Sequence, residues 1–151
     1  MTHLKLGVTM MSLEYGSLDL FDLISERHNM VRKVLGERWS EMSDVSISNS
    51  EWYIMAKIYK NQPTISSITK SVQITRQATH KFIKKLEEKG LVNVLNANNK
   101  RDKCIELTEL GERCVEKYNS IKKELEVKIS NHIGEKQFET LKELLGKEWG
   151  M

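Results

Sequence analysis

The side chains best suited to chemistry form a donor-rich group near the middle of the chain, between residues 75 and 85. They carry hydroxyl, guanidinium, amide, imidazole and ammonium groups: Thr75, Arg76, Gln77, Thr79, His80, Lys81 and Lys84. Such groups donate hydrogen bonds, and several are cationic. The chemistry that they predict is binding to an anion that also offers hydrogen-bond acceptors.

Catalytic chemistry has no comparable pattern in this sequence. There is no nucleophile elbow, phosphate loop or metal motif. The four histidines are not at ligand spacing: His3, His28, His80 and His132. Cys104 and Cys114 match neither a redox pair nor a zinc ribbon, and a buried, inert thiol is the expectation for each. We therefore expect no enzyme activity, no metal and no cofactor.

Two expected helices position the donor-rich group. The second helix begins after Thr75, which caps it, and ends at Gly90, which we expect in the left-handed backbone conformation typical of a helix C-terminus. Its apolar side comprises Ala78, Phe82, Ile83 and Leu86, and the donor-rich group faces away from it. A shorter helix precedes it, capped by Ser66 and running through Val72, and residues 64–65 fit a short edge strand before that cap.

Two expected strands follow these helices. Residues 91–95 and 103–107 have strand composition, and a polar run that contains Lys100 and Arg101 joins them. The pattern predicts a β-hairpin with a basic tip. Two short helices, a tight turn and a basic hairpin, in this order, predict a winged helix-turn-helix.

Longer amphipathic helices flank this unit on both sides. The sequence predicts a helix from about Ser17 to Ser43, one from Ser48 to Lys60 with Ser48 or Ser50 as its cap, and one that Thr108 caps and that continues to about His132. It also predicts a last helix that carries apolar residues: Phe138, Leu141, Leu145 and Trp149. The expected fold class is mainly α with a small β-hairpin wing. The expected regions are a leader at 1–16, a dimerisation helix at 17–47, the winged helix-turn-helix at 48–108 and C-terminal dimerisation helices at 109–151.

Positive charge is concentrated in the winged unit. Residues 64–103 contain nine Lys and Arg against three Asp and Glu, a net charge of +6, whereas the whole chain of 151 residues carries +3. Local basic excess is typical of a surface that binds a polyanion. Two unpaired cysteines, no signal-peptide pattern and no membrane-spanning segment favour the cytoplasm.

Duplex DNA is the polyanion that this arrangement fits. The major groove admits one helix and offers acceptors to arginine and paired sites to glutamine. We expect Arg76, Gln77 and His80 to read bases, and we expect phosphate contacts from four further residues of the same helix: Thr75, Thr79, Lys81 and Lys84. The start of the Ser66 helix could hold another phosphate, and Lys100 and Arg101 would reach the adjacent backbone or minor groove. A winged helix that binds protein instead of DNA is the alternative.

Two blocks of the sequence resemble the MarR-type (multiple antibiotic resistance) regulators. The first runs from Ile74 to Thr79 and continues in residues 85–92. The second is Lys100-Arg101 followed by residues 105–111, which contain Leu107-Thr108-Glu109-Leu110-Gly111. The resemblance implies a homodimer of intertwined terminal helices on a pseudo-palindromic operator, and a transcription regulator that is a repressor.

The resemblance also implies a small-molecule effector that releases DNA. His28, Trp39 and Trp52 are candidates for lining its pocket, although packing in the core is the alternative for each. Three features depart from the family pattern. Asn99 replaces an aspartate that braces the wing arginine, with Asp102 on the other side of Arg101, and Gln73 occupies a turn position often held by glycine.

Overall fold

The computed structural model describes residues 16–96 and 102–151. The chain divides into two compact units, Met1–Glu41 and Met42–Met151. The described part of the first unit consists mainly of helix α2 (Leu20–Met42). Asp19 precedes this helix, and its carboxylate accepts a hydrogen bond from the amide of Asp22 at 2.8 Å. The long helix predicted at the N-terminus is therefore confirmed.

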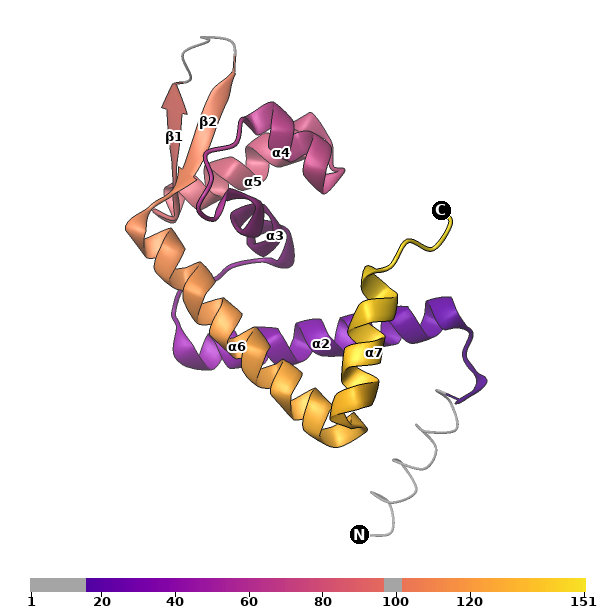
Figure 1. Cartoon of the computed structure of the whole chain (residues 1–151). Coiled ribbons are helices and arrows are strands. Elements are labelled where there is room, and N and C mark those ends of the chain that lie inside the picture. Colours follow the sequence, from indigo (N-terminus) through magenta and orange to yellow (C-terminus); the bar gives the residue numbers. More distant parts are fainter. Residues whose placement is uncertain (1–15, 97–101) are drawn as a thin grey trace. The chain divides into compact units, whose positions relative to one another are not determined.

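The second unit holds three short helices beside a hairpin (Figure 1). They are α3 (Asn49–Ile58), α4 (Ile65–Val72) and α5 (Arg76–Glu88). Strands β1 (Val92–Asn96) and β2 (Lys103–Leu107) pair antiparallel, with Val92 opposite Leu107 and Asn96 opposite Lys103. Buried side chains from all these elements form one core, including Ile54, Met55, Ile58, Ile68, Leu86, Leu91 and Ile105. The predicted winged helix-turn-helix is present.

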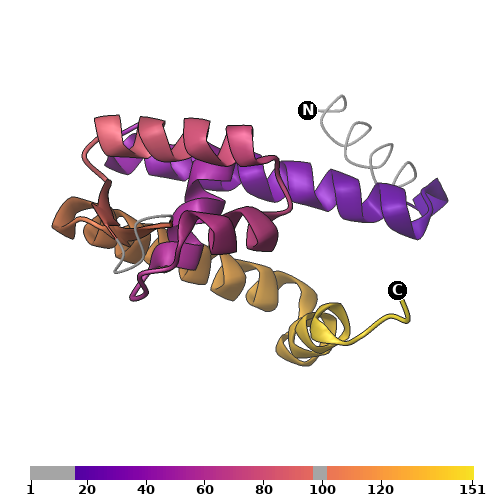
Figure 2. The same ribbon diagram turned by 90° about the horizontal axis from the view of Figure 1, so that it is seen from above.

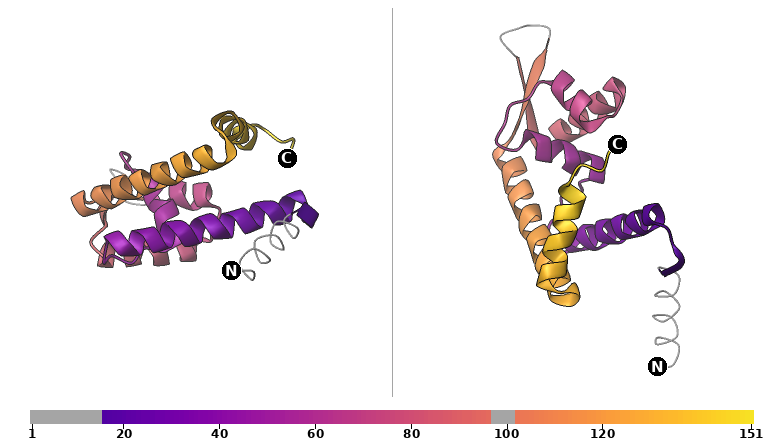
Figure 3. Two further views of the ribbon diagram at one scale, coloured as in Figure 1. Left: turned by 90° about the horizontal axis from the view of Figure 1, so that it is seen from below. Right: turned by 45° about the vertical axis from the view of Figure 1, so that its right-hand side comes forward.

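Two further helices complete the second unit. Helix α6 (Glu109–Ile133) leaves the base of the hairpin, and α7 (Glu135–Gly146) turns back at its far end (Figure 3). Trp149 was predicted on the last helix, but it lies beyond Gly146, and its indole donates to the carbonyl of Leu144 at 2.6 Å. In the described part of the chain, no helix is long and apolar enough to span a bilayer.

Thr108 and Gly111 shape the turn from the hairpin to α6. The Thr108 hydroxyl donates to the carbonyl of Gly90 at 2.7 Å and accepts from the amide of Gly111 at 3.0 Å. A Cβ at Gly111 would overlap the backbone carbonyl oxygen of Leu91. Thr108 therefore caps α6, as predicted. The missing side chain of Gly111 lets α6 pass close to the backbone of Leu91.

Candidate nucleic-acid interface

Helix α5 presents the donor-rich group because its opposite side is buried. Thr75 caps the helix as predicted, since its hydroxyl accepts from the amide of Ala78 at 3.0 Å. Ile83 and Leu86 are buried against the core. Five further residues of the donor-rich group, all except Thr79, are exposed: Arg76, Gln77, His80, Lys81 and Lys84. Figure 2 shows α5 along one side of the short-helix cluster.

Thr79 corrects one prediction of phosphate contact. Its side chain is 0% exposed, and its hydroxyl donates to the carbonyl of Thr75 at 3.0 Å. Thr79, Ile83 and Leu86 follow the spacing of four and three that places residues on one helix face. The periodicity therefore assigns Thr79 to the core, and the prediction that it contacts DNA is wrong.

The start of α4 differs from the prediction by two residues. Thr64, and not Ser66, caps the helix, because its hydroxyl accepts from the amide of Ser67 at 3.1 Å. The predicted edge strand is reduced to a single bridge between Thr64 and Cys104, beside a hydrogen bond from the amide of Ile105 to the carbonyl of Pro63 at 3.0 Å. Ser66 lies in the first turn of α4 and is exposed.

A cavity of about 630 Å³ lies between α4, α5 and the hairpin. Four of its lining residues are cationic: Lys70, Arg76, Lys84 and Lys103. Ser66 and His80 also line it, together with two carboxylates, Glu87 and Asp102. The structure thus brings four predicted site residues, Ser66, Arg76, His80 and Lys84, to one concave surface. Gln77, Lys81 and Thr75 lie outside this lining, and Lys100 and Arg101 lie outside the described residues.

Three members of this surface were not predicted from the sequence: Lys70, Glu87 and Lys103. Arg76, His80, Lys84 and Glu87 are spaced by four, four and three residues, so helical periodicity alone places Glu87 on the same stripe. Lys70 and Lys103 belong to other elements. Only the packing of α4 and β2 against α5 brings them to the cavity.

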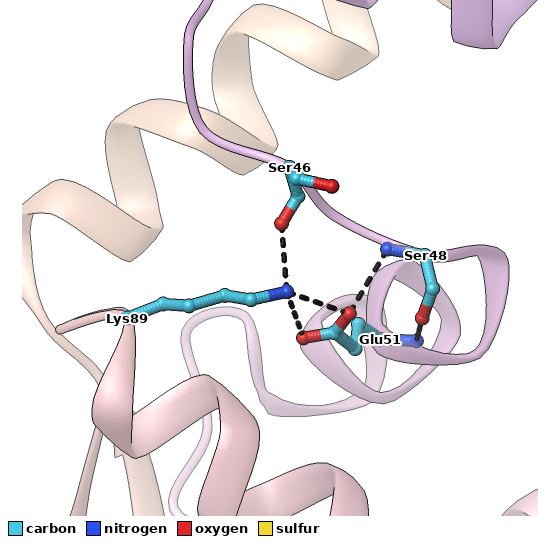
Figure 4. A network of polar contacts seen from close by, with 4 residues as sticks. All are labelled: Ser46, Ser48, Glu51 and Lys89. Carbon is cyan, nitrogen blue, oxygen red and sulfur yellow. Dashed lines mark hydrogen bonds and ion pairs between the residues drawn. The ribbon is translucent and has the colours of Figure 1, made fainter.

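A buried ion pair holds the C-terminal end of α5 (Figure 4). The ammonium of Lys89 donates to both carboxylate oxygens of Glu51, at 2.9 and 2.8 Å, and to the carbonyl of Ser46 at 2.7 Å. Glu51 also completes a capping box with Ser48 at the start of α3. The network connects α5 to α3 and to the segment that precedes α3.

Charge compensation decides the pKa of Glu51. Burial, the largest influence, raises it, but hydrogen bonds from Lys89 and Ser48 and the charge of Lys89 together lower the pKa below its usual value. Glu51 is therefore an ionised partner of Lys89 at neutral pH. No sequence pattern connected these residues, because they are 38 positions apart.

The three effector-pocket candidates have different surroundings. Trp52 is buried on α3, and its ring stacks on Tyr118 with centroids 4.0 Å apart and planes inclined by 6°. Trp39 is buried on α2, whereas His28 is exposed. His28 and Trp39 are eleven residues apart on one helix, which corresponds to about 16 Å. One molecule the size of an aromatic ring therefore cannot contact both.

The two thiols belong to β2 and α6 and are not among the residues that line the cavity. Cys114 is buried on α6, and burial raises its pKa above the usual value despite the nearby charges of Lys117 and Arg113. A raised pKa disfavours the reactive thiolate. Cys104 is half-buried on β2. Among residues 16–96 and 102–151, no three His, Cys, Asp or Glu side chains gather in a way that could hold a metal ion.

A helix-turn-helix followed by a hairpin, with a cationic cavity between them, defines a winged helix-turn-helix protein. The family model described as winged helix-turn-helix matches residues 50–126, and the chain belongs to that family. A search of curated protein sequences finds no match.

The fold is also that of solved MarR and MepR structures. Apo MarR from E. coli is 21% identical, with a TM-score of 0.69 over 85% of this chain and 95% of MarR. MepR, a transcription regulator of the Staphylococcus aureus multidrug efflux pump MepA, is 22% identical, with a TM-score of 0.68 over 85% and 94%. The S. aureus MepR–DNA complex matches with 22% identity and a TM-score of 0.71 over 85% and 94%.

Proposed function

We propose that this protein is a transcription regulator of the MarR type that binds duplex DNA sequence-specifically as a homodimer. The observation that carries the proposal is the exposed donor side of α5, which adjoins a cavity lined by four cations. Arg76 and Gln77 in the first turn have the donors that base edges accept, and His80 follows one turn later. A protein of this fold, MepR, has been solved in complex with DNA, which supports the same partner here.

The position of each residue on the fold determines whether it contacts a base or a phosphate. The first turns of a recognition helix reach deepest into the major groove, so Arg76, Gln77 and His80 contact bases. Thr75, Lys81 and Lys84 contact phosphates, and Ser66 does so from α4. Lys100 and Arg101, at the predicted tip of the wing, contact the adjacent backbone or minor groove.

Homodimer formation accounts for apolar side chains that the monomer leaves exposed. On α2 they include Leu20, Phe21, Ile24, Met30 and Val34. The C-terminal helices expose a second set: Val127, Ile133, Leu141, Leu144 and Leu145. Soluble monomers rarely expose large apolar patches, and a second copy would cover these side chains. The two α5 helices of such a dimer would lie about 34 Å apart, one turn of DNA.

The remaining parts of the proposal concern regulation. The dimer acts in the cytoplasm as a repressor, and a small molecule releases it from DNA. Trp39 and Trp52 remain candidates for its pocket, and His28 is a weaker one because it is exposed. These features rest on the resemblance to MarR-type regulators.

Salt dependence separates DNA binding from the alternative of a protein-binding winged helix. The test measures affinity for a random-sequence duplex by fluorescence anisotropy at increasing salt. A protein that contacts six to ten phosphates loses about 10³–10⁵ in affinity between about 50 and 200 mM salt. We expect a loss in this range. A protein that binds no duplex at low salt, or binds with no salt dependence, contradicts the proposal.

A further inference from the structure

Two acidic residues, Glu87 on α5 and Asp102 beside the hairpin, line the cationic cavity, and Asp102 is the one that a side-chain hydrogen bond ties to α4. It immediately precedes β2, and its carboxylate accepts a hydrogen bond from the hydroxyl of Ser66 at 3.3 Å. Ser66 belongs to the first turn of α4, so this bond connects the hairpin to the helix-turn-helix. The cations Lys70, Arg76 and Lys103 line the same cavity.

The proposed function determines what must pass through this cavity. When a helix occupies the major groove and a wing reaches the adjacent minor groove, one sugar-phosphate strand runs between them. In this protein the cavity lies between α4, α5 and the hairpin, and Figure 1 shows how these three elements are arranged. The cations that line the cavity favour a phosphate, whereas the carboxylates of Glu87 and Asp102 repel one.

From these positions we infer that Asp102 limits the affinity of this protein for DNA by placing a negative charge in the path of the phosphate backbone. This inference rests on the proposed function. Two unit charges about 6 Å apart in water repel each other enough to change an equilibrium about threefold. The backbone is common to all duplexes, so the repulsion weakens binding to every sequence alike and leaves base recognition to α5.

A structural role for Asp102 predicts a different outcome. If Asp102 only connected the hairpin to α4, an amide oxygen would accept the Ser66 hydroxyl equally well. Asp102→Asn would then leave DNA affinity unchanged. Asp102→Asn therefore separates the effect of the charge on DNA affinity from the effect of the hydrogen bond to Ser66.

Glu106, on the strand that follows Asp102, provides a matched control. Its carboxylate also accepts a side-chain hydrogen bond from the segment before α4, from the amide of Gln62 at 2.8 Å. Unlike Asp102, Glu106 is not among the residues that line the cavity. Glu106→Gln changes the net charge by the same amount as Asp102→Asn.

The experiment compares both variants with the wild type on two probes, a random-sequence 24-base-pair duplex and a duplex selected by the wild type from the same pool. We expect Asp102→Asn to tighten binding to both probes by the same factor, about three- to tenfold at low salt. The slope of log affinity against log salt should steepen by up to about one unit, since one more counterion is released. Glu106→Gln should change affinity by less than about twofold.

Several results overturn the inference. The first is an Asp102→Asn variant that binds DNA no more tightly than the wild type. The second is a gain in affinity of Asp102→Asn that differs between the two probes. The third is an equal gain in affinity in Glu106→Gln. Thermal unfolding checks that each variant is folded, and Asp102→Ser, which keeps a short polar side chain, replaces Asp102→Asn if that variant unfolds. A wild type that binds no duplex refutes the proposed function, whereas wild-type binding with no gain in Asp102→Asn refutes this inference alone.

Discussion

The pair of Lys89 and Glu51 offers a quantitative test of how α5 is held in place. Lys89→Met keeps the apolar part of the side chain and removes the ammonium that contacts both Glu51 oxygens. Glu51, which is 3% exposed, then retains its capping bond to the amide of Ser48 but has lost its cation. Removing one partner of a buried ion pair costs about 3–5 kcal/mol. Because the Lys89 side chain is 31% exposed, water reaches the site, and we expect about 3 kcal/mol.

The penalty should shrink as the pH falls. In the wild type the pKa of Glu51 is lowered from 4.5, so its stabilisation is complete above that pH and is lost as the pH falls through the folded-state pKa. In Lys89→Met the Ser48 hydrogen bonds remain but both contributions of Lys89 are lost, so the pKa of Glu51 is higher than in the wild type. The folded variant therefore takes up a proton at a higher pH than the folded wild type. The stability difference between the two proteins thus shrinks as the pH falls from about 7 to about 4.

Urea unfolding followed by circular dichroism, at one protein concentration, measures this difference at each pH. Lys57→Met on α3 is the control, because its ammonium lies at the surface, 5.3 Å from the centroid of the Tyr53 ring. We expect the control to lose no more than about 1 kcal/mol. The assigned role of Lys89 is contradicted if Lys89→Met is no less stable than Lys57→Met, or if the loss of unfolding free energy in Lys89→Met is the same at the highest and the lowest pH measured.

Three further variants test local features of the fold, each by its unfolding midpoint. Gly111→Ala should cost about 3 kcal/mol, because the new methyl group overlaps the Leu91 carbonyl and α6 must shift; a loss below about 0.5 kcal/mol contradicts that contact. Gln73→Gly should stabilise by about 0.5 kcal/mol, because Gln73 has φ 54° and ψ 38°, a conformation that favours glycine; destabilisation argues against this backbone. Thr79→Val should lose about 1 kcal/mol with the bond to Thr75 and leave DNA affinity unchanged, and a loss of affinity would restore Thr79 to the interface.

Local signals in the sequence predicted most of the fold. Ser48, Thr75 and Thr108 were expected at helix starts and do accept first-turn amides there, because a cap is a contact between residues three apart. Gly90 has the expected positive φ, of 74°. Ser66 failed as a cap because Thr64 has the same capability, and the bond from Ile105 to Pro63 fixes the chain at that earlier point. That hydrogen bond joins residues that are far apart in the sequence, so no local pattern predicts it.

The part of the candidate site that lies on one helix was predictable, because it also depends on local spacing. Arg76, His80 and Lys84 share one helix stripe, which periodicity gives directly. The contributions of Lys70, Lys103 and Asp102 depend on how α4 and β2 pack against α5. Thr79 shows the opposite error, because its polar side chain was assigned to the surface although its spacing matches Ile83 and Leu86 in the core.

The most direct test of the central claim is the sequence preference of Arg76→Ala. The control is Arg113→Ala, which removes the same kind of side chain from a site where it pairs with Glu109 at 3.1 Å. Affinity is measured for a duplex that the wild type selects from a random pool and for the unselected pool. We predict that Arg76→Ala loses about 1–3 kcal/mol on the selected duplex and much less on the pool, so that its preference relaxes. An Arg76→Ala variant that retains both the affinity and the preference of Arg113→Ala would contradict the assignment of α5 as the helix that reads DNA.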